Sequence, residues 1–200
     1  SRDAAAWCSM TGNALISNTA EKGIYTVVVE KVDKKDRKTV LAGDGRGKTF
    51  ILFSQELDKA LATFVLANGA AATGEKVTIF FTFWGLNVIK KVKKPKVKKD
   101  IFGKMFGIML PSNSLKLKLS KFNMFGIGSA MMRYIMKAKG IDSLESLRQQ
   151  ALDNGVEFIA CQMSMDVMGV TKEELIDEVT IGGVATYMSH ADNANINLFI

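Results

Sequence analysis

From residue 48 to its end, the chain alternates between short apolar runs and amphipathic stretches. Three apolar runs, at residues 49–53, 76–83 and 156–161, have the character of strands buried on both faces. Two shorter segments, at residues 179–181 and 195–200, predict further strands. Because helical patterns separate these strands, the sequence predicts an α/β fold, with a mainly parallel sheet and helices on both of its faces.

The predicted helices have start and stop signals of their own. A first helix occupies residues 54–69, an amphipathic helix follows at residues 143–154, and a last one at residues 183–191. A further short helix has Glu173 and Glu174 in its first turn, which favours that end of the helix dipole. The predicted caps and stops, in chain order, are Ser54, Asn68-Gly69, Gly155 and Thr171.

The first thirty residues have a different pattern. Residues 2–11 predict a short helix that Gly12 and Asn13 end, and residues 14–17 and Ile24–Glu30 predict two strands. The turn between these strands contains Asn18, Lys22 and Gly23. A piece of this size cannot build a stable core alone.

Residues 33–47 are charged and rich in Gly, which is typical of a linker. The predicted organisation is therefore an N-terminal piece at residues 1–32, a linker at 33–47 and a main domain at 48–200. The chain begins with Ser, which suggests a fragment of a longer protein.

Charge and cysteine content narrow the class of protein. Two Cys form no disulfide framework, so we expect a reducing, cytoplasmic location. No segment has the roughly 18 consecutive apolar residues that a membrane span needs. The net charge is +7, and much of it lies in one run of lysines: Lys90, Lys91, Lys93, Lys94, Lys96, Lys98 and Lys99.

We interpret this lysine run as a solvated loop. The functional alternatives are an anionic cofactor, an acidic partner or a membrane surface. The run lacks interleaved aromatic residues and no nucleic-acid-binding motif occurs elsewhere, so we expect no nucleic acid partner.

Cys161 is the strongest candidate for chemistry, because it ends a predicted strand and the next residues predict a helical turn. A thiol at a helix amino end is favoured as thiolate, the form that attacks sulfur. A buried, inert Cys remains the alternative. Ligands gather at the carboxyl ends of parallel strands, where the other candidates are Ser54, Thr82, Trp84, Gly85, Gln162, Met163, Gly182 and Gly183.

Other chemistries find little support. His190 is the only His and precedes the last strand, so it should lie at the opposite rim of the sheet from Cys161. A Cys–His pair is therefore not expected, and we interpret His190 as a structural or surface residue. No phosphate loop, dinucleotide fingerprint or zinc-type spacing occurs, so we expect neither a metal nor another cofactor.

Met and Phe recur at high density in residues 102–136, interrupted by Lys116, Lys118 and Lys121. This composition is typical of a core or a subunit interface. The alternatives are a helix that lies on a membrane surface and a hydrophobic ligand pocket.

Residues 48–200 resemble the DsrE/DsrF-like proteins, in particular a subgroup labelled peroxiredoxin-like that accompanies CoA-disulfide-reductase-type enzymes. The matching segments are TFILFSQELDKALATFVLANGA, KVTIFFTFWGLNVIKK, FIACQMSMDVMGVTKEELIDEV and IGGVATYMSHADNANINLFI. The resemblance implies a five-stranded parallel sheet, homo-oligomers and a Cys that passes on sulfane sulfur, here Cys161. The sequence contains no peroxidatic Thr-x-x-Cys pattern that would match the word peroxiredoxin in the label of this subgroup.

The N-terminal segment AAWCSMTGN and the hairpin after it resemble the second half of a TusA-like sulfur carrier. The active Cys of that family lies in the first half, so Cys8 does not match it and we interpret Cys8 as structural. A parent protein with the missing half would be a two-domain sulfur relay.

Two functional hypotheses follow. In the first, the protein is a sulfurtransferase or sulfur carrier that holds a persulfide on Cys161, between donor and acceptor thiols such as a TusA-like protein or a CoA-disulfide-reductase-type enzyme. In the second, Cys161 is a core residue of a non-catalytic assembly or membrane-proximal binding module. The first hypothesis depends on a reachable thiol at the rim of the sheet.

Overall fold

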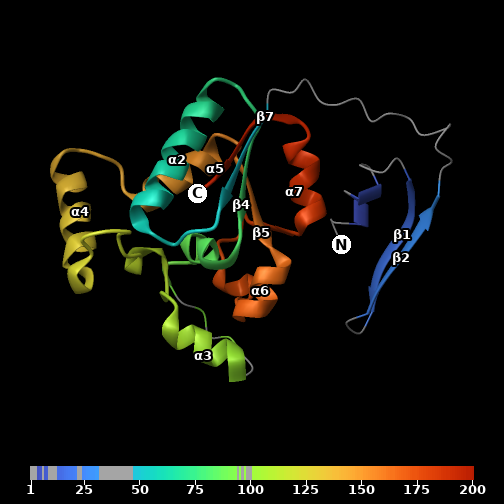
Figure 1. Cartoon of the computed structure of the whole chain (residues 1–200), viewed down its shortest axis with the longest axis horizontal. Coiled ribbons are helices and arrows are strands. Elements are labelled where there is room, and N and C mark those ends of the chain that lie inside the picture. Colours follow the sequence, from blue (N-terminus) through green and yellow to red (C-terminus); the bar gives the residue numbers. More distant parts are fainter. Residues whose placement is uncertain are drawn as a thin grey trace.

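The computed structural model describes residues 4–5, 7–8, 13–21, 24–31, 47–93, 95, 97 and 101–200. Its centre is a five-stranded, fully parallel sheet with the strand order β6-β5-β4-β3-β7 (Figure 1). The α/β fold predicted from the sequence is confirmed. The strands are β3 (Gly47–Leu52), β4 (Val77–Phe81), β5 (Glu157–Cys161), β6 (Thr180–Gly182) and β7 (Ala194–Phe199).

Helices cover both faces of the sheet (Figure 1). α2 (Leu57–Ala72) and α5 (Leu144–Asp153) lie against one face, and α7 (Val184–Ala191) lies against the other. The main core forms under α2 and α5, where Phe64, Phe81 and Phe158 are fully buried and pack ring against ring. Strand residues alternate between the faces, so the side chains between these core residues point toward α7.

The first helix differs from its prediction at both ends. Ser54 does not cap it: α2 begins at Leu57, and the Ser54 hydroxyl accepts the backbone N–H of Glu56 at 3.3 Å. Asn68 and Gly69 do not end it, because α2 continues to Ala72. The Asn68 side chain donates to the carbonyl of Leu147 in α5 at 2.9 Å, so it joins two helices instead of stopping one.

The later predicted elements agree with the structure. Ser143 caps α5 by accepting the N–H of Ser146, and Gly155 follows α5 with a φ of 79°. Thr171 is the N-cap of the short 3-10 helix η4 (Lys172–Glu174), and its N–H donates to the Glu174 carboxylate at 3.0 Å. The helical turn expected after Cys161 is α6 (Gln162–Met168).

The middle of the chain contains short helices whose boundaries were not predicted. They are η1 (Phe83–Ile89), α3 (Ile101–Met109), η2 (Ser114–Lys116), η3 (Met124–Gly126) and α4 (Ile127–Ala138). Among the described helices, none is long and apolar enough to cross a bilayer.

The solvated loop predicted for the lysine run is wrong at its start. Lys90 is buried, and its ammonium donates to the carbonyl of Pro111 at 3.2 Å. Lys91 forms an ion pair with Asp177 at 2.6 Å. Lys94, Lys96, Lys98 and Lys99 lie outside the described residues.

The N-terminal piece is a two-stranded antiparallel sheet of β1 (Ala14–Glu21) and β2 (Ile24–Glu30). β1 is longer than predicted, so Asn18 pairs with Val27 inside the sheet and does not belong to the turn. Ala4, Ala5, Trp7 and Cys8 are helical, as expected. The predicted linker lies outside the described residues except for Gly47, which opens β3.

Candidate functional site

Cys161 lies where the sequence placed it, at the carboxyl end of β5 and directly before α6. It pairs with Gly182 of the neighbouring strand β6. Side chains alternate along β5. Phe158 and Ala160 belong to the main core under α2 and α5, so Ile159 and Cys161 point to the opposite, α7 face of the sheet.

The thiol is enclosed and does not lie open at the rim. Cys161 is 3% exposed and packs with Phe80, Ile159 and the partly buried ring of Tyr187 from α7. It makes no side-chain hydrogen bond to the first turn of α6. The position of Cys161 along the chain is therefore as predicted. Its thiol, however, is not reachable from solvent as expected, and Tyr187 of α7 packs against the cluster that contains it.

Tyr187 holds α7 over this cluster through two contacts. Its ring packs on Phe80 with centroids 5.3 Å apart, and its hydroxyl lies 3.3 Å from the Thr49 hydroxyl of β3. Thr49 also donates to the side chain of Asn197 in β7. Tyr187, which packs against the cluster that contains Cys161, is thus connected to the two strands at the β7 edge of the sheet.

The side chains at the start of α6 point either into the protein or into solvent. The Thr82 hydroxyl lies 2.8 Å from the buried hydroxyl of Ser164, which fastens α6 to the end of β4. Gln162 is exposed and donates to Asp166 one turn along the same helix. Met163 is also exposed, so neither Gln162 nor Met163 encloses the thiol as a pocket wall would.

Gly182 and Gly183 lie beside Cys161 at the start of α7. A Cβ on Gly182 would come within 3.0 Å of both Ile159 and Thr186, so the absence of a side chain lets α7 approach the sheet closely. Gly183 is the N-cap of α7. Both glycines therefore help to close the cover over Cys161.

Ser54 and Trp84 lie together, but in another cavity. It has a volume of about 500 Å³ at the ends of β3 and β7, and Phe53 and Phe199 also line it. Gly85 supports its floor: its N–H donates to the carbonyl of Phe53, and a Cβ would lie 1.9 Å from the carbonyl oxygen of Leu52. The eight candidate residues thus divide between two places.

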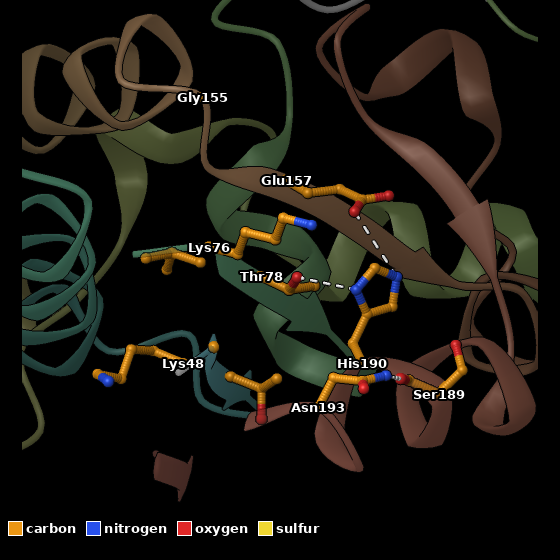
Figure 2. Close-up of a pocket in the computed structure, with 11 residues that line it drawn as sticks. Lys48, Lys76, Thr78, Gly155, Glu157, Ser189, His190 and Asn193 are labelled. Carbon is orange, nitrogen blue, oxygen red and sulfur yellow. Dashed lines mark hydrogen bonds and ion pairs between the residues drawn. The ribbon is translucent and has the colours of Figure 1, made fainter. Parts of the chain in front are cut away.

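A larger cavity, of about 610 Å³, opens at the amino edge of the sheet (Figure 2). His190 of α7 points into it between β4 and β5, with its Nδ1 3.2 Å from the Thr78 hydroxyl and its Nε2 3.6 Å from the Glu157 carboxylate. Glu157 begins the strand that Cys161 ends, so His190 lies at the opposite rim from the thiol, as predicted.

Thr78 and Glu157 were not predicted as partners of His190. The available signal was the alternation within β4 and β5, which directs both side chains to the α7 face. The Thr78 hydroxyl, the His190 imidazole and the Glu157 carboxylate contact one another in the order seen in a catalytic triad, but the Thr78 side chain is buried. We assign this group a structural role, which is to fasten the end of α7 to the sheet. Among the described residues, no cluster of His, Cys, Asp and Glu could hold a metal ion.

Comparison with known proteins relates most of the chain to one family. The sequence profile of the DsrE/DsrF/DrsH-like family matches residues 46–199. The protein YrkE of Bacillus subtilis is 43% identical over 152 residues, which are 76% of this chain and 95% of YrkE. The sulfur carrier protein DsrE2 of Allochromatium vinosum is 39% identical over 148 residues, which are 72% of this chain and 91% of DsrE2.

A solved structure is also similar in outline. The YchN protein of E. coli aligns with 77% of this chain and 99% of its own, with a TM-score of 0.45 and 11% sequence identity.

Proposed function

Because the chain belongs to the DsrE/DsrF/DrsH-like family, we propose that it is a sulfur carrier that holds sulfane sulfur as a persulfide on Cys161. The relative from Allochromatium vinosum bears the name of a sulfur carrier, which supports this role. One observation carries the assignment to a residue: Cys161 is the only Cys within the segment that matches the family. A carrier that uses a thiol of this domain therefore uses Cys161.

The proposed transfer moves one sulfur atom between thiols. The Cys161 thiolate attacks the outer sulfur of a donor persulfide, and a new S–S bond forms as the donor's S–S bond breaks. The donor leaves as a thiolate, so no external oxidant or reductant is consumed. An acceptor thiolate then attacks the outer sulfur on Cys161 and restores the starting thiol.

Access to Cys161 requires that its cover moves. With the thiol 3% exposed, a donor reaches it only after a local opening, which we assign to α7, because Tyr187 of this helix packs against the cluster that contains Cys161. Closed again, α7 would keep the persulfide away from water and stray thiols. This opening is a local event of the kind that costs less than global unfolding, because α7 has only eight residues.

The partners are part of the same proposal. Donor and acceptor would be thiols of other proteins, among them a TusA-like carrier and a CoA-disulfide-reductase-type enzyme. The N-terminal hairpin would be the remainder of a TusA-like domain, and the family domain, residues 48–200, would form homo-oligomers. The chemistry needs no cofactor, because the sulfur atom itself is the cargo.

Intact-mass spectrometry after incubation with a low-molecular-weight persulfide tests the carrier. We expect the wild-type chain to gain the mass of one sulfur atom, which a reductant then removes. Cys161→Ser should abolish this gain. Cys8→Ser is the matched control, because Cys8 is also buried but lies outside the family domain, and it should retain the gain.

The burial of Cys161 favours a second function, a non-catalytic binding module in which this thiol is a core residue. This alternative predicts no mass gain in the wild-type chain under native conditions. It also predicts that Cys161→Ser leaves sulfur transfer to an acceptor thiol unchanged. Either result would overturn the carrier proposal.

A further inference from the structure

Exposed apolar side chains cover the outer side of α4 and the turn before it. Six of them are each more than half exposed, and we call them the α4 patch: Phe122, Met124, Phe125, Ile127, Met131 and Tyr134. In Figure 1, α4 projects at the edge of the molecule, away from the sheet. Single exposed apolar residues are ordinary, but a contiguous group of this kind marks an interaction surface.

The helix turns its apolar stripe toward solvent. Ile127, Met131 and Tyr134 are spaced at i, i+4 and i+7, so they share one face of α4. Gly128 and Met136 are buried on the inward side. An amphipathic surface helix normally buries such a stripe, so the outer face of α4 lacks a partner within the described part of the chain.

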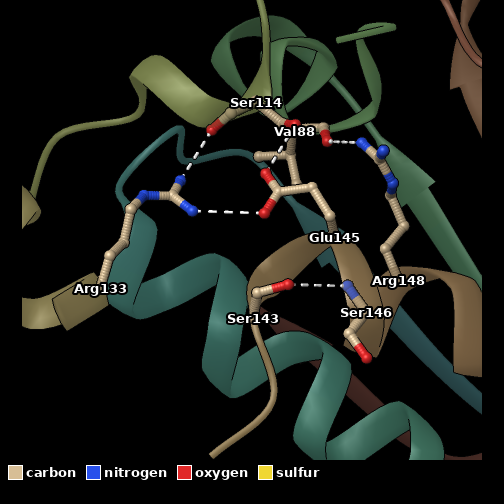
Figure 3. Close-up of polar contacts among 7 residues, drawn as sticks. All are labelled: Val88, Ser114, Arg133, Ser143, Glu145, Ser146 and Arg148. Atoms are coloured by element: carbon tan, nitrogen blue, oxygen red, sulfur yellow. Dashed lines mark hydrogen bonds and ion pairs between the residues drawn. The ribbon is translucent and has the colours of Figure 1, made fainter. Parts of the chain in front are cut away.

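α4 is held firmly in this orientation (Figure 3). Arg133 donates to the Glu145 carboxylate at 3.3 Å and to the carbonyl of Ser114 at 3.0 Å. The buried hydroxyl of Ser114 donates to the other oxygen of Glu145 at 2.8 Å. Because Glu145 lies in the first turn of α5, this network fastens α4 to α5.

A second attachment holds the chain just before the patch. The Asp58 carboxylate in α2 accepts hydrogen bonds from the N–H and the hydroxyl of Ser120. Burial works against ionisation of Asp58, but the Ser120 hydrogen bonds outweigh it and hold the pKa of Asp58 below its usual value. The patch is therefore presented by a fixed element.

The turn before α4 has an unusual backbone. Phe122, Met124 and Phe125 have φ values of 55°, 42° and 57°, a region that bulky side chains rarely adopt. Gly128 makes this turn possible, since a Cβ there would lie 2.0 Å from the carbonyl oxygen of Phe122. Strain of this kind occurs mostly at functional sites, and here it directs two aromatic rings outward.

The charged residues of the segment that carries the patch have one sign, and the carboxylates beside it, Asp58, Asp142 and Glu145, are engaged in hydrogen bonds. Residues 101–141 contain no Asp or Glu. The basic residues of this segment are Lys104, Lys116, Lys118, Lys121, Arg133, Lys137 and Lys139. All except Arg133 are exposed. A second copy docked face to face would bring like charges together, whereas an anionic surface would pair them.

We propose that the α4 patch docks on the surface of a bilayer that contains anionic phospholipids. Phe122, Phe125 and Tyr134 would enter the interfacial region, and the flanking lysines would lie among the headgroups. The proposal combines two features of this surface, which are its outward aromatic and aliphatic side chains and the positive charge of the segment that carries them. It does not depend on the sulfur chemistry of Cys161.

Co-sedimentation of the full chain with sucrose-loaded vesicles tests this docking. We expect binding to phosphatidylcholine vesicles that contain phosphatidylglycerol, and at least about tenfold weaker binding to pure phosphatidylcholine or at high salt. The double variant Phe122→Ser/Phe125→Ser should bind the anionic vesicles at least about tenfold more weakly. The matched control is Val65→Ser/Leu66→Ser on α2, where both side chains are also exposed, and it should bind as wild type.

A charge-reversal variant keeps the test independent of the aromatic turn. Lys121→Glu/Lys137→Glu changes only exposed side chains, and it should also lose binding to anionic vesicles. Equal binding by wild type and both variants, or no binding by wild type, would overturn the proposal. So would light scattering that shows a wild-type oligomer which Phe122→Ser/Phe125→Ser dissociates, because a second copy of the chain would then cover the patch.

Discussion

At the scale of single residues, Tyr187 is the side chain through which we expect α7 to restrict access to Cys161. Its ring packs on Phe80 and belongs to the cluster around the thiol, and its hydroxyl reaches Thr49. Tyr187→Ala removes the aromatic pair and the hydroxyl contact together. If the cover loosens by about 1.4 kcal/mol, the population with an open thiol rises about tenfold. We therefore expect Tyr187→Ala to raise the rate of Cys161 alkylation by iodoacetamide at least about tenfold.

Tyr134→Ala is the control for this measurement, because it removes the same side chain from the exposed face of α4. It should leave the alkylation rate unchanged. Rapid alkylation of the wild-type thiol, with no further increase in Tyr187→Ala, would show that α7 does not restrict access.

The sequence was sufficient to locate Cys161 but not to describe its surroundings. An apolar run that ends at a Cys and continues into a helical pattern fixes the position of the thiol along the strand, because both signals are local. Exposure depends instead on side chains of other elements, among them Tyr187, which joins the cluster around Cys161 only after α7 packs on the sheet. The division of Ser54 and Trp84 from Cys161 arises in the same way, from strand order.

At the scale of elements, α2 shows why a local stop signal failed. Asn68-Gly69 is typical of a helix end, but Asn68 bonds to Leu147 and receives a bond from Asn154, so contacts with α5 keep the helix going. The middle helices were not placed because 3-10 pieces such as η1 and η2 are too short to show a period. The five strands, α2 and α5 were identified from pattern alone, whereas α4 was missed although it is longer than α5.

This extension of α2 predicts a stabilising substitution. Gly69 lies inside the helix and is exposed, and a Cβ there would meet nothing within 4 Å. Ala restricts the unfolded chain more than Gly and suits a helix better, so Gly69→Ala should raise the free energy of unfolding by about 0.5–1 kcal/mol. The change should appear as a higher urea midpoint with an unchanged slope.

Gly74 provides the matched comparison, since a Cβ there also meets nothing within 4 Å but its φ is 82°. Gly74→Ala should therefore lower the midpoint, because Ala is strained at positive φ. If Gly69→Ala proved destabilising as well, α2 would not continue past Asn68 in solution.

At the scale of the whole molecule, the chain divides unevenly at the start of β3. The main core contains side chains from Phe50 to Val179 with Ile200 packed against it, and none of the described residues of the N-terminal piece belongs to it. Among the described residues, β1 and β2 pair only with each other. The opposite end of the chain is different, since β7 pairs along β3 and the N–H of Phe53 donates to the carbonyl of Ile200.

Removal of the N-terminal piece should consequently change the stability little, whereas removal of β7 should lower it strongly. Deletion of residues 1–45 takes nothing from the core, so we expect the midpoint of thermal unfolding to stay within about 2 °C of the full chain, the shift that well under 1 kcal/mol would cause. Deletion of residues 194–200 removes a strand, uncovers β3 and leaves Thr49 without Asn197, so this variant should not show a cooperative transition. Calorimetry of both variants measures the difference. A large loss of stability on removal of residues 1–45 would mean that the hairpin packs against the sheet and that the family domain is not an independent folding unit.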